Sequence, residues 1–175
     1  QALCDAWMNR YPTVSISFRQ IDGLNFMDAY RQLVYEIALL YQKHTYLLDS
    51  QAISKQEKAL FQQISDRKAE KTDVMRSIQF LTLLLNKHYN KKVILLIDEY
   101  DVPVAKANNN GYYAEMLDVM KGLMQALKDN QALRFAVVTG CLKIAKESIF
   151  TGTNNFVSDT ITNSRLSEYF GFVQS

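Results

Sequence analysis

The apolar positions near the start of the chain change period within about 15 residues. Residues 13–19 alternate between polar and apolar side chains, are rich in β-branched residues and follow Pro12. This alternation predicts a strand. From Phe26 onward the apolar residues recur at helical spacing, and Asn25 suits the N-cap of that helix. The residues of this helical face are Phe26, Tyr30, Leu33, Val34, Ile37 and Tyr41.

The next segment, residues 49–73, is much more polar. Ser54 followed by Glu57 fits a capping box, in which each side chain satisfies a backbone donor at the start of a helix. The apolar stripe of this helix is thin, so we expect a peripheral helical segment. A better-buried helix should follow and end near Tyr89, with a face made of Val74, Ile78, Leu81, Leu85 and His88.

The second half of the chain contains continuous apolar runs. Residues 93–97 (VILLI) predict a strand that is covered on both faces, and residues 134–139 predict a third buried strand. Residues 156–161 are a candidate fourth strand. Residues 108–111 predict a loop, and an amphipathic helix should then run from Tyr113 to Leu127.

Strands that alternate with long helices predict an α/β fold with a mainly parallel sheet. We expect helices on both faces of that sheet, as in a three-layer arrangement. The chain contains two prolines and six glycines and has no linker-like tract, so residues 1–175 predict one domain. Ligands of such sheets bind at the carboxyl ends of the strands, which directs attention to the residues after Ile97 and Val138.

Composition excludes several classes of protein. The 48% hydrophobic and 22% charged residues are ordinary for a globular domain, and no apolar run is long enough to cross a bilayer. A net charge of +2 gives no reason to expect a membrane or nucleic-acid partner, although nucleic acid stays open. Cys4 and Cys141, with His44 and His88, have no zinc-like spacing, and the cysteine usage predicts a reducing, cytoplasmic compartment.

Asp98 and Glu99 directly follow the apolar run 93–97. Four apolar residues and then Asp-Glu form the Walker B pattern of P-loop ATPases, in which Asp98 would hold Mg²⁺ and Glu99 would orient and deprotonate the attacking water. The local pattern also suits a solvated strand end. Thr139 ends the next predicted strand and suits a sensor of the γ-phosphate. Locally, a hydroxyl that caps a turn beside Gly140 is the simpler interpretation.

Four segments decide between these alternatives: VILLIDEYDVPV, GYYAEMLDVMKGLMQALKDN, RFAVVTGCLKIAKESIFTGTNNF and EYFGF. Together they resemble the bacterial and archaeal AAA-ATPase-like family over residues 93–172. The resemblance implies Walker B roles for Asp98 and Glu99, a sensor role for Thr139, and ATP and Mg²⁺ as cofactors. It also implies a nuclease-like domain of the PD-(D/E)xK type further along the same chain as a partner. Asp101 and Pro103 match the family pattern without an assigned role.

One expected part of the family is missing from residues 1–175. A phosphate-binding loop needs glycines followed by Lys-Ser or Lys-Thr, and no Gly-Lys-Ser/Thr occurs in this sequence. We therefore expect a P-loop-like sheet that is incomplete at its first strand, and weak or no ATP binding by these residues alone. The alternative is a non-hydrolysing interaction or regulatory domain that retains the fold.

The resemblance also implies the strand order 5-1-4-3-2. Residues 13–19, 93–97 and 134–139 would be the second, third and fourth strands. The strand 134–139 should therefore pair with 93–97. Its other edge should be bare, covered by 156–161 or paired with another chain, which leaves self-association open.

Other candidate residues are weaker. Ser148 has no nearby histidine, Arg165 could complete a neighbour's site, and the cluster Tyr169, Phe170 and Phe172 is typical of a core or an interdomain contact. Lys106 should lie in a loop beyond Pro103, which disfavours a nuclease site here.

Overall fold

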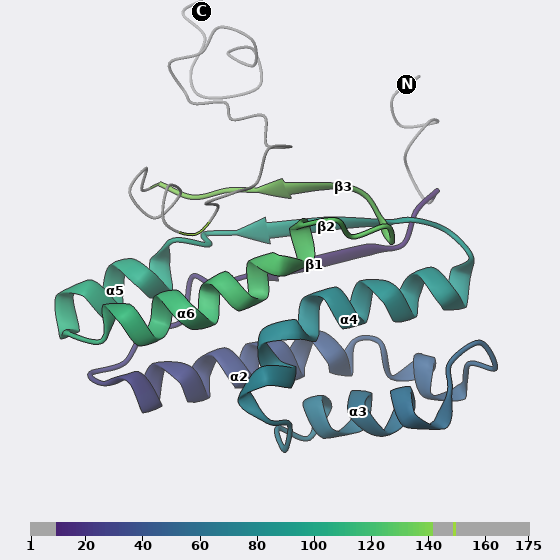
Figure 1. The fold of residues 1–175 in the computed structure, drawn as a ribbon, viewed down its shortest axis with the longest axis horizontal. Helices are drawn as coiled ribbons and strands as arrows, with labels where there is room; N and C mark the ends of the chain where they lie inside the picture. Colours follow the sequence, from purple (N-terminus) through teal and green to yellow (C-terminus); the bar gives the residue numbers. More distant parts are fainter. Residues whose placement is uncertain (1–9, 142–148, 150–175) are drawn as a thin grey trace, which may run out of the picture.

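The computed structural model describes residues 10–141 together with Ile149, and Figure 1 shows their arrangement. Three strands and five α-helices, with two short 3₁₀ helices, make up this part of the chain. In chain order they are β1 (Thr13–Ser17), α2 (Phe26–Gln42), η1 (Thr45–Asp49), α3 (Lys55–Ser65), α4 (Lys71–Tyr89), β2 (Val93–Asp98), α5 (Val102–Asn110), α6 (Tyr113–Met124), η2 (Gln125–Leu127) and β3 (Leu133–Val138). The predicted α/β class with a parallel sheet is confirmed.

The three strands form one parallel sheet in the order β1-β2-β3. Val14 of β1 lies opposite Leu95 of β2, and Leu95 lies opposite Ala136 of β3. A register shift between Val93 and Ile94 marks an irregularity at the start of the β2–β3 pair. The prediction that 134–139 lies beside 93–97, with 13–19 outside that pair, is confirmed.

All described helices lie on one side of the sheet, below the strands in Figure 1. Val14 and Ile16 of β1, and Val93, Leu95 and Ile97 of β2, face these helices and are buried. The expectation of helices on both faces is therefore wrong for residues 10–141. The reason is topological: both crossovers step in the same direction across the sheet, and right-handed crossovers that step in one direction place their helices on one face.

The opposite face of the sheet is open in the described structure, and we call it the open face. Ile94 and Leu96 of β2 are half-buried there, and Phe135 and Val137 of β3 are 40% and 46% exposed. The description of 134–139 as a buried strand was thus wrong for one of its faces. An apolar run predicts burial on both sides, but burial also requires a second layer of structure to be present.

The predicted helix starts are confirmed. The Asn25 side chain accepts a hydrogen bond from the backbone N–H of Asp28 at 3.1 Å. Ser54 and Glu57 form the expected capping box, with hydrogen bonds of 2.9 and 3.3 Å. Phe61 and Ile64 bury the narrow stripe of α3, which packs at the edge of the helical layer away from the sheet (Figure 1).

The loop predicted at 108–111 is largely helical. Residues 108–110 form the last turn of α5, and only Gly111 leaves the helix, with a φ of 81°. Lys106 also lies within this helix, so its predicted loop position was wrong. Pro103 is accommodated in the first turn of α5, where a missing N–H costs nothing.

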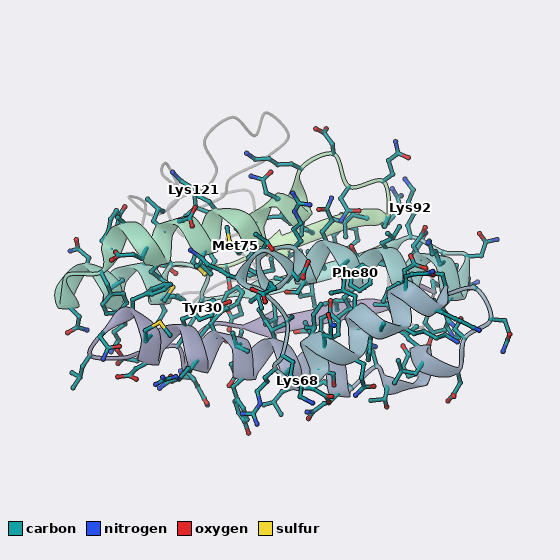
Figure 2. All side chains as sticks on the ribbon, turned by 60° about the horizontal axis from the view of Figure 1, so that its bottom comes forward. Tyr30, Lys68, Met75, Phe80, Lys92 and Lys121 are labelled. Carbon is teal, nitrogen blue, oxygen red and sulfur yellow. The ribbon has the colours of Figure 1, made fainter. Side chains whose placement is uncertain are left out.

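Helices α4 and α6 approach closely at a glycine. A Cβ added to Gly122 of α6 would lie 2.7 Å from Met75 Cβ, so a larger residue would require the helices to shift. Figure 2 places Met75 where the two helices meet. Among residues 10–141, no helix is long and apolar enough to span a membrane.

Several predicted features lie outside the described residues. They are the strand at 156–161, Cys4, Ser148, Arg165 and the aromatic cluster Tyr169, Phe170 and Phe172.

Candidate functional site

Three oxygen-bearing side chains meet at the carboxyl edge of the sheet. Asp98 is the last residue of β2, and its Oδ1 accepts a hydrogen bond from the Thr139 hydroxyl just beyond β3. Its Oδ2 accepts from the Ser17 hydroxyl at the end of β1, at 3.3 Å. All three residues are exposed. The structure therefore brings together Asp98 and Thr139, which the sequence singled out, and adds Ser17.

The register of the sheet shows on which of its faces these three side chains lie. Side chains alternate between the two faces of β1. Ser17 lies on the same face as the exposed Thr13 and Ser15, whereas Val14 and Ile16 face the helices. Asp98 lies opposite Ser17 and is likewise exposed. The three side chains therefore lie on the same side as the open face, away from the helical layer.

Glu99 occupies an unusual backbone conformation. Its φ is 52°, in the left-handed region that glutamate rarely adopts. Such a conformation costs on the order of 1–3 kcal/mol and is found disproportionately at functional sites. The left-handed turn ends β2 immediately after Asp98 and leaves the Glu99 side chain half-buried.

The loop after β3 is tied to the loop that joins β2 to α5. The backbone N–H of Thr139 donates to Ile97 O at 2.8 Å, and the N–H of Tyr100 donates to Thr139 O at 3.2 Å. The Tyr100 ring is buried beneath Gly140. Burial, followed by the negative charge of Asp101, raises the pKa of the Tyr100 hydroxyl to about 12, so it stays neutral.

The donor set fits Mg²⁺ in type. A carboxylate and hydroxyls are oxygen ligands, and Mg²⁺ commonly uses one or two protein carboxylates while water and phosphate oxygens complete its shell. Within residues 10–141, no group of three or more His, Cys, Asp and Glu residues is arranged to hold a metal ion. The described residues would therefore supply only part of the ion's coordination shell.

An open groove of about 740 Å³ runs along β1 and α2 beside this edge. It is lined by Ser17 together with charged side chains that include Arg19, Glu36 and Lys43. Asp98 and Glu99 are not part of its lining. The groove is thus a neighbour of the candidate site and does not enclose it.

Sequence reasoning missed Ser17 and gave Asp101 no role. The signal for Ser17 was its place near the carboxyl end of the predicted strand 13–19, the kind of position that also singled out Asp98 and Thr139. Lys106, considered for nuclease chemistry, instead forms an exposed ion pair with Asp22 at 3.0 Å.

Two comparisons place the chain among known proteins. A curated relative, described as an uncharacterized protein in the vnfD 5′ region of Azotobacter chroococcum mcd 1, is 34% identical over 87 residues. The aligned part covers 49% of this chain and 17% of the relative, so the chain spans a small fraction of that protein's length. No solved structure matches the chain.

The family comparison covers far more of the sequence. The family described as predicted AAA-ATPases, AAA-ATPase-like, matches residues 3–150. This range contains the whole described sheet and the cluster of Ser17, Asp98 and Thr139. The chain belongs to the AAA-ATPase-like family.

Proposed function

We propose that this chain forms the hydrolytic part of an ATPase domain, and that residues outside 1–175 supply the phosphate-binding loop. The observation that carries this proposal is the contact of Asp98 with Thr139 and Ser17 at the carboxyl edge of a parallel sheet. Ligands bind at this edge in open α/β sheets. The strand order β1-β2-β3 is the one expected for the second to fourth strands of a P-loop ATPase.

Each side chain has a defined task in this proposal. Asp98 orients the Mg²⁺ that accompanies ATP, directly or through water, and Glu99 positions the attacking water and accepts its proton. Thr139 would contact the γ-phosphate. Bound Mg²⁺ supplies charge neutralisation on the phosphate oxygens.

In this proposal the upstream strand, phosphate loop and helix lie on the open side of the sheet. The open face and the Asp98 carboxylate lie on the same side, and the edge of β3 that faces away from β2 is where a first strand would pair. A strand, phosphate loop and helix that arrive there would complete the three-layer arrangement and bring the phosphates next to Asp98. An upstream Gly-Lys-Ser/Thr loop is therefore part of the proposal. Its absence from the full-length protein would favour the non-hydrolysing alternative.

The process that hydrolysis drives is a further proposal, which rests on resemblance alone. ATP-dependent rearrangement would control a nuclease-like domain in the same polypeptide.

The test is a matched pair of substitutions in the full-length protein. Glu99→Gln removes the base while keeping size and polarity, so we expect turnover to fall by about 10²–10⁴-fold with ATP binding retained. Asp98→Ala should instead weaken Mg-ATP binding. Phosphate release and calorimetric titration measure the two effects.

Glu115→Gln makes the same chemical change at an exposed position in the first turn of α6 and serves as the control. It should leave turnover unchanged. If the Glu99→Gln protein hydrolyses ATP as fast as this control, Glu99 has no catalytic role.

A further inference from the structure

The turn that carries Thr139 is held in place by a side chain from a different part of the chain. Asp101 lies at the start of α5, and its Oδ2 accepts a hydrogen bond from the backbone N–H of Cys141 at 2.9 Å. The two residues are 40 positions apart. Thr139 adds one backbone hydrogen bond to Ile97 of β2 and one to Tyr100 of the β2–α5 loop, so three hydrogen bonds attach the turn to residues 97–101.

Burial of the Asp101 carboxylate is unfavourable in free energy. Asp101 is 2% exposed, and a buried carboxylate is tolerated only when hydrogen bonds compensate for its lost hydration. Asp101 lies at the N-cap position of α5, yet its side chain makes no capping bond to that helix. Its carboxylate reaches across to the turn after β3 instead, so helix capping does not account for it.

Gly140 lets the turn come this close. A Cβ at this position would lie 2.6 Å from Asp101 Oδ1 and 2.4 Å from the Tyr100 ring, which is closer than real Cβ contacts come. Thr139, Gly140 and Cys141 thus rest directly on Tyr100 and Asp101. A shift of this turn would move the Thr139 hydroxyl away from Asp98.

We propose that Asp101 is a positioning residue that holds the turn of Thr139, Gly140 and Cys141 against the end of β2, and so keeps the Thr139 hydroxyl on Asp98. The catalytic consequence rests on the proposed ATPase function, whereas the holding of the turn does not. This assignment gives a physical role to the second aspartate of the DEYD sequence.

The experiment compares Asp101→Ala and Asp101→Asn in the full-length protein. The amide oxygen of asparagine can still accept from Cys141, and alanine cannot. Hydrogen exchange, read by mass spectrometry with single-residue fragmentation, should therefore speed up at the Cys141 amide by tenfold or more in Asp101→Ala. In Asp101→Asn it should stay within about threefold of the wild-type rate. Asp101→Leu, which fills the buried space without an acceptor, should behave like Asp101→Ala and replaces it if the smaller side chain prevents folding.

Steady-state kinetics separate positioning from mere stability. We expect kcat to fall by on the order of tenfold or more in Asp101→Ala with little change in KM, because the chemical step depends on the placement of Thr139. Asp101→Asn should restore most of kcat.

Each result decides one of the two proposals. Unchanged Cys141 exchange in a folded Asp101→Ala or Asp101→Leu protein would overturn the positioning role. So would exchange in Asp101→Asn that is as fast as in an unfolded peptide. If the wild-type protein hydrolyses no ATP, the proposed function fails, and the exchange measurement still decides whether Asp101 holds the turn.

Discussion

Three residues in the loops that follow β2 and β3 have features that are unfavourable by themselves. Glu99 adopts a left-handed backbone conformation, Asp101 is a buried carboxylate, and Gly140 has no room for a side chain. Each of these features costs stability unless the surrounding structure compensates. All three lie in the two neighbouring loops beside Asp98 and Thr139, so the unfavourable features are concentrated at the candidate site.

The glycine in this group gives a direct stability prediction. Gly140→Ala would place a methyl group against the Tyr100 ring and Asp101 Oδ1, so we expect a loss of about 1–3 kcal/mol in the free energy of unfolding, measured by urea denaturation. Gly111→Ala is the control because Gly111 has a positive φ but nothing within 4 Å of an added Cβ. It should cost only about 1 kcal/mol of backbone strain. A smaller loss at Gly140 than at Gly111 would show that the turn moves freely.

A second prediction at this scale concerns His44. Burial, followed by the charge of Lys43, holds the pKa of His44 below its usual 6.5. The unfolded chain therefore binds a proton more readily than the folded one, so stability is full above about 6.5 and is lost as the pH falls toward the folded pKa. The melting temperature of His44→Gln should drop less between pH 7 and pH 5 than that of the wild type. Equal drops would mean that His44 contributes nothing to the acid sensitivity.

At the scale of elements, local sequence signals set the helix starts. Ser54 and Glu57 cap α3, and Glu57 also forms an ion pair with Lys87 of α4 at 2.5 Å. Glu57 thus both caps α3 and links it to α4, and this ion pair adds to the packing of Phe61 and Ile64.

The cap can be tested by itself. Ser54→Ala removes the acceptor for the Glu57 N–H and should cost about 1 kcal/mol in chemical denaturation. Ser54→Asp keeps an acceptor at the cap and should retain most of the stability. If the alanine and aspartate variants unfold at the same urea concentration, the cap is not what stabilises α3.

At the scale of the described fold, residues 10–141, the main feature is a sheet whose helices cover one face. Phe135 and Val137 are exposed on the open face, while Ala136 and Val138 of the same strand pack on the helical side. An apolar face of this kind in a P-loop-like sheet is where a second layer belongs. The proposed upstream strand and helix would supply it.

Neighbouring substitutions on β3 can test this layer. Val137→Lys should leave the stability of residues 1–175 nearly unchanged but destabilise the full-length protein by several kcal/mol, because only there would the charge become buried. Val138→Lys, one residue away on the core side, should destabilise both. The melting temperature of each variant is measured in residues 1–175 and in the full-length protein, which makes four proteins. Equal tolerance of Val137→Lys in both proteins would argue against a covering layer.

The sequence by itself determined most of the elements and the acidic residues at one strand end. Helical periodicity, the caps at Asn25 and Ser54, and the acidic pair after 93–97 are local signals, and local hydrogen bonds and burial decide them. It did not reveal α5, because Pro103 and the asparagines at 108–110 are typical of a loop. Only the packing of Val104 and Ala107 into the core makes that segment helical.

The tertiary structure decided what lies together. Ser17 and Thr139 are 81 and 41 residues from Asp98, and strand order and register alone bring them to one carboxylate. The same pairing places Asp101 beneath Cys141 and, among residues 10–141, leaves one face of the sheet open. The energy of these contacts arises between segments that are distant along the chain, so no local window of the sequence contains it.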